Sequence, residues 1–455
     1  MTFTSVNPHD PADVLGEWEA ASFAEADAAV SRALKAAQAW RDTPGAARAK
    51  ALSDAATALE QRAAEVTDLV IREVGKPVSE ARGEVGRGVA ILRYYAQEAL
   101  APDGETLPAA QADQLLMARH LPVGVAALLT PWNFPVAIPL WKAAPSLAYG
   151  NATMLKPSSA AAATGLLLGE ILGQFLPADV FQVVLGGAQT AGALIDHPGV
   201  AAVSFTGSSA VGRDISVRAA RRGGRVQAEM GGQNPSIVLA DADLDRAAKT
   251  IAYAAMGYAG QKCTATSRVI VVDEVYRPFR ERLVAAIEAL KVLDPADPAT
   301  LVGPVIDEGS RAAALTAVAG SGGRILTGGK PLDAPGYYLA PTLVELDQPV
   351  GPLADEEVFA PVTALIRAGS TDDAIAIGNA VRYGLVASVF TSDLGNALRL
   401  TRRVEAGMVR VNAPTSGVDF NAPFGGAKDS SYGPREQGKA ARAFYTESRT
   451  VLIVP

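Results

Sequence analysis

The chain has 455 residues, of which 49% are hydrophobic and 20% are charged. This composition is typical of a globular protein and excludes a chain that is disordered or collagen-like throughout. The length predicts roughly three domain-sized units of about 150 residues. The formal net charge of -7 argues against nucleic-acid binding, because phosphate contacts need a concentrated excess of Lys and Arg.

The single cysteine, Cys263, leaves no intramolecular disulfide and no set of thiolates for a metal site. The three histidines are scattered, so we predict no metal centre. The N-terminus lacks the basic segment and apolar run of a signal peptide, and no apolar stretch is long enough to span a membrane. We therefore expect a protein of a reducing compartment, the cytoplasm, with no membrane partner.

Helical spacing of apolar residues predicts helices from Phe23 to about Ala101. The polar stretch 102–119 is expected to form an irregular or hairpin excursion. Short β-rich runs then alternate with helix-like segments, which is the pattern of βαβ units and of a parallel sheet covered by helices. These runs lie at 123–130, 152–157, 181–186, 201–207 and 235–240.

A second alternating series begins near Lys249 and continues beyond a Pro/Gly turn region at 328–337. Two tandem α/β units are therefore predicted in preference to one very wide sheet. The tail FYTESRTVLIVP is rich in β-forming residues and has no obvious place in either unit. Since unpaired strand edges must be covered, we expect it to pair with the 102–119 excursion or with another subunit.

Cys263 lies in AGQKCTATSR, between a helix-like segment and a strand. Its small polar neighbours and the adjacent Lys262 suit an accessible thiol, because a nearby cation favours the thiolate. A lone cysteine is as often an inert buried side chain, so the local sequence leaves both readings open. No histidine has a distinctive setting, and a carboxylate is therefore favoured as any general base.

Glu229, in QAEMGGQNPSIV, is the best candidate for that base. It follows a short apolar run and precedes two glycines, which places a carboxylate at a strand end beside flexible backbone. The alternative is a surface glutamate before a turn. In TPWNFP, Asn133 lies in a Pro-bracketed loop that would fix an amide donor, as an oxyanion site requires, although it could equally satisfy its own turn.

Two further segments suggest contacts to phosphate or ribose groups. FTGSSAVG is a strand entering a helix, with Gly207 at the turn and Ser208 at the cap, so its amides would suit a phosphate. It lacks the full GxGxxG pattern, and an ordinary capped helix explains it too. Lys156 in LKPSS would reach a ribose or phosphate, or be solvated. We expect the aromatic residues Trp132, Phe134 and Trp141 in the core rather than in a pocket.

Together these segments resemble the aldehyde dehydrogenase family, which acts with NAD or NADP. TPWNFP, LKPSS, FTGSSAVG, EMGGQNP, GQKCTATSR, EEVFAPV and PFGGAKDSSYG occur in family order from about residue 20 to the C-terminus. The resemblance implies an α/β fold with two tandem α/β domains, a variant Rossmann cofactor domain and a catalytic domain, and a small β oligomerisation element. The implied ranges are 1–101 and 120–229 for dinucleotide binding, 230–435 for catalysis, and 102–119 with 436–455 for assembly into a homodimer or homotetramer.

The resemblance also implies residue roles. Cys263 would be the nucleophile that forms a thiohemiacetal and then a thioester, and Asn133 would stabilise the oxyanion. Glu229 would activate the water that hydrolyses the thioester, and Glu436, in GPREQG, would assist proton movement. The implied cofactor contacts are Thr130, Pro131, Trp132, Lys156, Ser158, Ser159, Gly207, Ser208, Gly231, Glu357 and Phe359.

Ser159 departs from the pattern of many NAD-preferring members, which carry a glutamate at that position. A carboxylate there would accept the ribose hydroxyls and repel a 2′-phosphate. A serine removes this repulsion, so we expect NADP as the preferred cofactor and NAD as the alternative.

The segment NAPTSGVDFNAPFGGAKDSSYGPREQG, with GQKCTATSR, is similar to the α-ketoglutaric semialdehyde (2,5-dioxopentanoate) dehydrogenase branch. The resemblance implies a small-molecule aldehyde that bears a carboxylate, yet Ala413, Ala422 and Ala427 supply no cation and no arginine stands out as its clamp. Succinic semialdehyde or a plain aliphatic or aromatic aldehyde remains an alternative substrate. Other classes stay open: transfer of the acyl group to coenzyme A, a cysteine esterase, and a non-catalytic structural or binding relative.

Overall fold

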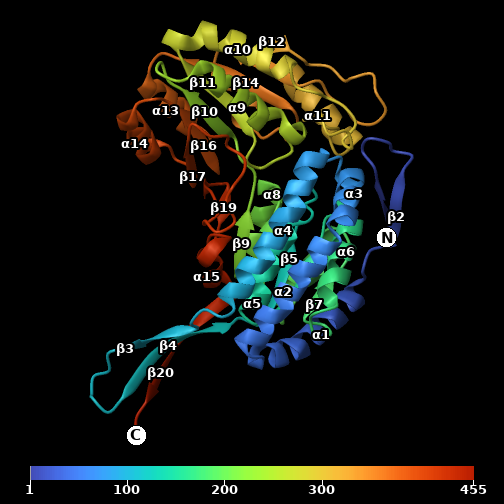
Figure 1. Cartoon of the computed structure of the whole chain (residues 1–455), viewed down its shortest axis with the longest axis vertical. Coiled ribbons are helices and arrows are strands. Elements are labelled where there is room, and N and C mark those ends of the chain that lie inside the picture. Colours follow the sequence, from blue (N-terminus) through green and yellow to red (C-terminus); the bar gives the residue numbers. More distant parts are fainter. Residues whose placement is uncertain (1) are drawn as a thin grey trace.

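The computed structural model describes residues 2–455 (Figure 1). It contains two large sheets, with the strand orders β19-β9-β8-β5-β6-β7 and β12-β13-β14-β11-β10-β16-β17. All neighbouring strands are parallel except at one edge of each sheet, where β19 and β12 pair antiparallel with their neighbours. The predicted α/β class with two sheet-based units is confirmed.

The six-stranded sheet is covered by helices on both faces. Its strands are β5 (Val125–Leu129), β6 (Ala152–Lys156), β7 (Phe181–Val183), β8 (Ala202–Thr206), β9 (Arg225–Glu229) and β19 (Ser431–Tyr432). Its helices are α1 (Phe23–Asp42), α2 (Gly45–Gln61), α3 (Ala63–Val74), α4 (Val78–Glu98), α5 (Ala137–Ala148), α6 (Ala162–Gly173), α7 (Ala188–Asp196) and α8 (Ser209–Arg221).

The central strand β5 is hydrophobic throughout because both of its faces are buried. Successive side chains of a strand point to opposite faces of the sheet. Val125, Ala127 and Leu129 join the core formed with α1, α7 and α8. Ala126 and Leu128 join the core formed with α2, α4, α5 and α6. Since both faces are buried, the strand carries no polar alternation.

The seven-stranded sheet has the same layered construction. Its strands are β10 (Asn234–Val238), β11 (Thr266–Val272), β12 (Arg324–Thr327), β13 (Thr342–Leu346), β14 (Val362–Ala368), β16 (Val386–Phe390) and β17 (Met408–Val411). The accompanying helices are α9 (Leu244–Met256), α10 (Tyr276–Glu288), α11 (Glu308–Ala319), α12 (Pro352–Asp355), α13 (Thr371–Asn379) and α14 (Leu394–Arg403). The short strands β15 (Tyr383–Gly384) and β18 (Ala427–Lys428) pair with each other. The last helix, α15 (Arg442–Tyr445), packs beside α5 and β9 of the six-stranded unit.

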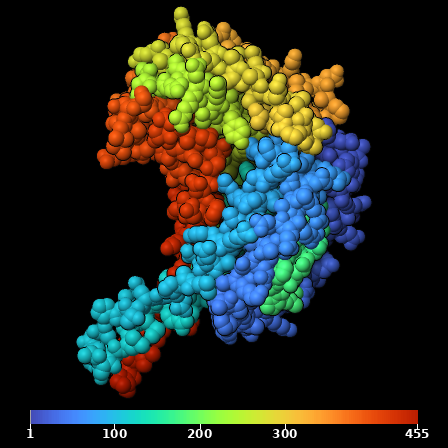
Figure 2. Space-filling view, in the orientation of Figure 1, coloured from blue at the N-terminus to red at the C-terminus, as the bar shows by residue number. Residues whose placement is uncertain are grey.

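A three-stranded antiparallel sheet forms an arm that extends away from the rest of the chain (Figures 1 and 2). It contains β3 (Gly104–Leu107), β4 (Leu115–Pro122) and β20 (Thr446–Ile453), and β20 pairs with β4. The prediction that the tail pairs with the excursion is therefore confirmed, although β4 continues beyond residue 119.

A hairpin at the N-terminus was not predicted from the sequence. The N-terminal residues form an antiparallel hairpin of β1 (Thr2–Val6) and β2 (Val14–Glu19). Among residues 2–455, no helix is both long and apolar enough to cross a membrane.

A buried ion pair holds the loop between β5 and α5. Lys76 and Glu84 pair with side chains that are 0% and 1% exposed. The Glu84 carboxylate also accepts the backbone N–H groups of Val136 and Ala137, at 2.8 and 2.9 Å. Lys76 Nζ donates to the carbonyl of Asn133 at 2.7 Å. Both charges are satisfied, and together they fix the 130–136 loop against α4.

Breaking the Lys76–Glu84 ion pair should therefore lower the stability of the protein. Lys76→Met leaves the Glu84 carboxylate buried without its cation, so we expect the free energy of unfolding to fall by about 3–5 kcal/mol in chemical denaturation. Lys50→Met is the matched control, because Lys50 pairs with Asp54 while 76% exposed. Its effect is expected to stay below about 1 kcal/mol. Equal effects of the two substitutions would contradict this account.

Candidate active site

Cys263 lies on the wall of a cavity of about 370 Å³ and is partly exposed. Asn234 fixes this segment, because its Nδ2 donates to the carbonyls of Cys263 and Ala265, both at 2.8 Å. The wall is contributed by α4, the start of α5, the cysteine loop and the 414–424 loop. Its residues are Ser79, Glu80, Gly83, Glu84, Arg87, Phe134, Trp141, Tyr253, Lys262, Cys263, Thr264, Pro414, Ser416, Gly417, Val418 and Phe424.

The expected role of Lys262 in ionising the thiol is wrong. Lys262 Nζ pairs with Glu80 at 2.6 Å, so its charge is neutralised. Burial raises the pKa of the Cys263 thiol, and the carboxyl groups of Glu357 and Glu229 raise that pKa further. The neutral thiol is thus favoured in this environment, and its proton must leave before sulfur can act as a nucleophile.

Asn133 lies beside the cysteine loop. Its Nδ2 donates to the carbonyl of Gln261 at 2.9 Å, and the side chain is 3% exposed. A primary amide has two N–H groups, so one donor remains for another acceptor. The structure therefore brings Asn133, from the loop after β5, to the segment that carries Cys263.

Glu229 is the last residue of β9 and is 1% exposed, so the surface-glutamate alternative is wrong. Its Oε2 accepts a hydrogen bond from the Ser431 hydroxyl, and its Oε1 has no hydrogen-bond partner. Burial raises the pKa of this carboxyl well above its usual value, and the nearby Glu436 raises the pKa further. A buried carboxyl with an elevated pKa and a free oxygen is suited to exchange a proton.

Glu436 belongs to a buried polar network beside Glu229. It forms an ion pair with Lys142, and the two side chains are 2% and 1% exposed. It also accepts hydrogen bonds from Trp141 Nε1 at 2.8 Å and from the Ser204 hydroxyl at 3.2 Å. The network connects the carboxyl end of the six-stranded sheet to the aromatic wall of the cavity.

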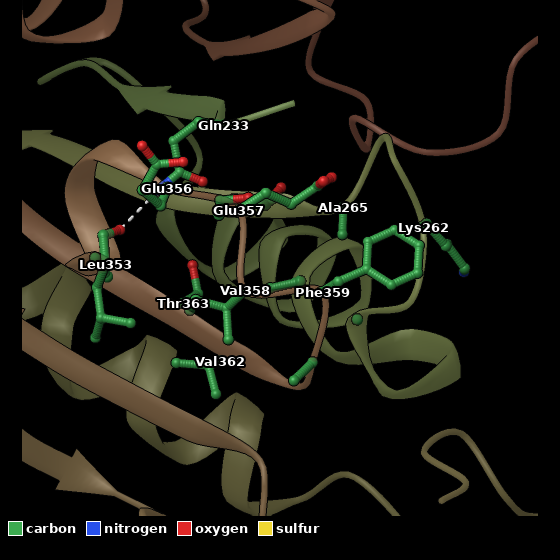
Figure 3. A pocket seen from close by; sticks show the side chains of 16 residues that line it. Gln233, Lys262, Ala265, Leu353, Glu356, Glu357, Val358, Phe359, Val362 and Thr363 are labelled. Atoms are coloured by element: carbon green, nitrogen blue, oxygen red, sulfur yellow. Dashed lines mark hydrogen bonds between the residues drawn. The ribbon is translucent and has the colours of Figure 1, made fainter. Parts of the chain in front are cut away.

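Glu357 and Phe359 lie in the segment that enters β14, near Gln233 and Ala265, which directly precede β10 and β11 (Figure 3). The backbone N–H of Gly232 donates to Glu357 at 3.2 Å. A Cβ at Gly231 would lie 2.2 Å from Oε2 of Glu357, so a larger residue at 231 would displace the carboxylate. Burial raises the pKa of Glu357 to about 7.

Trp132 also reaches this segment. Its ring lies edge-on to that of Phe359, with 5.8 Å between the ring centroids. Trp132 follows Thr130 and Pro131, which lie directly after β5. The structure thus gathers the predicted residues of the 130–132 segment, Gly231, Glu357 and Phe359 in one region.

Lys156 is buried, so the alternative that its side chain is solvated is wrong. Its Nζ donates to the carbonyls of Pro157 and Gly186, both at 2.8 Å, and burial lowers its pKa to about 8. Ser158 caps the short turn Ser159–Ala161 by accepting the N–H of Ala160 at 3.3 Å. These residues lie at the carboxyl end of β6, where nucleotides bind in open α/β sheets.

At the same edge of the sheet, the buried hydroxyls of Thr130 and Thr206 have no hydrogen-bond partner among residues 2–455. Gly207 follows Thr206, and a Cβ there would lie 2.5 Å from the Phe205 ring. Ser208 is the N-cap of the 13-residue helix α8, whose first N–H groups are available to an anion. The donor set therefore fits a dinucleotide that lies across the ends of β5, β6 and β8.

The expectation for the aromatic residues holds only in part. Trp141 is 8% exposed and packs in the core, and Trp132 and Phe134 pack against the same core. Phe134 and Trp141 also line the cavity. Arg87 and Tyr253 are cavity residues that the sequence did not single out. Their helices were predicted only as helices, and no motif marks which face turns toward the cysteine.

Comparisons with known proteins agree with this arrangement. The model of the aldehyde dehydrogenase family matches residues 1–451. The chain is 40% identical to the α-ketoglutaric semialdehyde dehydrogenase of Bacillus subtilis over 99% of this chain and 94% of the relative. It is 36% identical to the 2,5-dioxopentanoate dehydrogenase of Saccharolobus solfataricus, with 99% and 95% covered.

Solved structures show the same fold. The putative aldehyde dehydrogenase from Burkholderia cenocepacia matches with a TM-score of 0.96 and 37% identity, and the match covers 100% of this chain and 94% of that one. PnpE in complex with nicotinamide adenine dinucleotide matches with a TM-score of 0.96 and 34% identity over 100% and 94%. This chain therefore belongs to the aldehyde dehydrogenase family and is an NAD(P)-dependent aldehyde oxidoreductase.

Proposed function

We propose that the protein oxidises a short aldehyde that bears a carboxylate, such as 2,5-dioxopentanoate or succinic semialdehyde, to the corresponding acid, with NADP preferred over NAD. The observation that carries the proposal is the placement of Cys263 on the cavity wall, with Asn133 hydrogen-bonded to the cysteine loop. The names of the relatives support the substrate class. They include a succinate-semialdehyde dehydrogenase from Paenarthrobacter nicotinovorans at 36% identity.

Cys263 is the proposed nucleophile. Its thiol proton passes to water, and the sulfur then bonds to the aldehyde carbon while the C=O π electrons move to oxygen, which gives a thiohemiacetal. The carbonyl oxygen gains negative charge in this step. The free N–H of Asn133 and the backbone N–H of Cys263 are the proposed donors that stabilise this charge.

Glu229 is the proposed base for the second half of the reaction. After the thiohemiacetal is oxidised to a thioester, Glu229 takes a proton from water, whose oxygen attacks the thioester and releases the acid. Because the pKa of Glu229 is raised, this carboxyl loses its proton, and so becomes a base, only at a pH above the range in which glutamate ordinarily titrates. Glu436, which is paired with Lys142, is the proposed positioning residue that favours proton exchange at Glu229.

The proposed cofactor contacts follow the edge of the six-stranded sheet and the Glu357 segment. Thr130, Lys156 and the start of α8 would hold the ribose and phosphate groups, and Glu357 with Phe359 would hold the nicotinamide end. When bound there, NAD(P)⁺ would supply the hydride acceptor for oxidation of the thiohemiacetal. We likewise propose the ranges 1–101 with 120–229 for dinucleotide binding and 230–435 for catalysis.

The segments 102–119 and 436–455, which include most of the arm, are the proposed assembly element of a homodimer or homotetramer. Leu452, Ile453 and Val454 are each more than half exposed on the single chain, and a partner would cover them. We propose the cytoplasm as the location, because the lone cysteine matches a reducing compartment. The non-catalytic alternative is not favoured, since Cys263, Glu229 and Asn133 are all present.

The dehydrogenase assignment predicts that Cys263→Ala abolishes turnover. The substitution removes the sulfur that bonds to the aldehyde, so reduced-cofactor formation from succinic semialdehyde should fall at least about 1000-fold. Binding of NADP and the circular dichroism spectrum should stay unchanged. Residual activity near that of the unmodified protein would refute Cys263 as the nucleophile.

The cofactor preference predicts an effect of Ser159→Glu. A carboxylate beside the adenosine ribose would repel a 2′-phosphate, so kcat/KM for NADP should fall by about 10- to 100-fold, whereas that for NAD should change little or rise. Ser159→Gln is the matched control, because it adds similar bulk without charge. If glutamate and glutamine lower kcat/KM for NADP equally, charge repulsion at this position is not the cause.

A further inference from the structure

In the part of the chain that the structure describes, the cavity that holds Cys263 contains one cation without an ionic partner. Four charged side chains line it: Glu80, Glu84, Lys262 and Arg87. Glu80 pairs with Lys262 at 2.6 Å, and Glu84 pairs with Lys76. Within residues 2–455, no acidic side chain lies within 4.0 Å of the Arg87 guanidinium. Since Lys76, which lies behind the wall, neutralises Glu84, the charge of Arg87 is the one on this wall that no ion pair compensates within the described residues.

Most of the donor capacity of Arg87 is free. One guanidinium N–H donates to the carbonyl of Val418, and a guanidinium has five N–H groups in a planar fork. Arg87 is half-buried. The apolar part of the same wall is formed by Phe134, Trp141, Pro414, Val418 and Phe424. A partly desolvated arginine beside apolar side chains strongly favours an anion that accepts two parallel hydrogen bonds.

The backbone that carries Arg87 is rigid. Arg87 lies one helical turn after Glu84 on α4, so both side chains point to the same side of the helix. Glu84 is tied to Lys76 and to the start of α5, while Arg87 is tied to the loop that contains Val418. These contacts hold α4 in place on the side that faces the cavity. A binding side chain on such a helix keeps its position better than one on a mobile loop.

We propose that Arg87 binds the distal carboxylate of the substrate and makes the enzyme selective for ω-carboxylated aldehydes. This inference rests on the proposed function and supplies its missing recognition residue. The carboxylate provides the counter-ion that the protein itself does not, and the apolar wall contacts the methylene groups between the carboxylate and the aldehyde. An uncharged aldehyde of the same length makes only the apolar contacts.

The test compares succinic semialdehyde with butanal, which has the same number of carbons and no carboxylate. Arg87→Met keeps a long unbranched side chain and removes the charge. It should lower kcat/KM for succinic semialdehyde by about 10- to 100-fold, mainly through KM, and leave butanal unchanged or improved. Arg82→Met is the matched control, because Arg82 is exposed on the same helix and is not part of the cavity wall. It should change neither substrate.

Several outcomes would overturn the assignment of Arg87. Equal losses on both substrates would mean that Arg87 acts through the Val418 loop alone, and no change on either would mean that the carboxylate binds elsewhere. In both cases a wild-type preference for succinic semialdehyde would leave the proposed function intact. A wild-type enzyme that oxidises butanal but not succinic semialdehyde would refute the substrate class and this inference together.

A second variant covers the case in which Arg87→Met does not fold. Arg87→Lys keeps the positive charge and loses the planar fork, so it should retain part of the preference for succinic semialdehyde over butanal. Thermal unfolding and circular dichroism establish folding for each variant. If folded Arg87→Lys shows the full wild-type ratio for the two substrates and competitive inhibition by succinate is also unchanged, the bidentate contact is wrong.

Discussion

The hydrogen bond from Asn133 to the carbonyl of Gln261 joins the loop after β5 to the loop that carries Cys263. The first loop belongs to the six-stranded sheet, and the second leads into β11 of the seven-stranded sheet. Lys76 and Glu84 hold the first loop from behind, and Asn234 holds the second. The site is therefore defined by the junction of two units, and neither sheet alone contains it.

Burial and the grouping of acidic residues dominate the electrostatics of the site. Burial raises the pKa values of Cys263, Glu229 and Glu357, and the nearby carboxyl groups raise the pKa of the thiol further. The uncharged forms of these three groups are thus favoured by their surroundings. Lys142 and Lys262 are paired with Glu436 and Glu80, so neither cation acts directly on the thiol.

Much of this arrangement could be predicted because its residues follow strand ends in distinctive short motifs. Glu229 and Asn133 were singled out because they lie at strand ends, and Cys263 because it is the single cysteine of the sequence. The tail was paired with the arm because an exposed strand edge needs a partner. Lys262 was misjudged because its partner, Glu80, is remote in sequence. Arg87 was missed because a polar residue on a long helix has the same local pattern whether it faces solvent or a cavity. The N-terminal hairpin was not predicted, although the turn-forming pairs Asn7-Pro8 and Asp10-Pro11 lie between its two strands.

The central claim is that Cys263 forms the covalent intermediate and Glu229 releases it. The most direct measurement is peptide mapping by mass spectrometry of Glu229→Gln after incubation with succinic semialdehyde and NADP. Without its base the enzyme should form about one equivalent of reduced cofactor and accumulate a succinyl thioester on Cys263, because the glutamine amide cannot activate water. One equivalent of reduced cofactor with no acyl group on Cys263, or with the acyl group on another residue, would contradict the account.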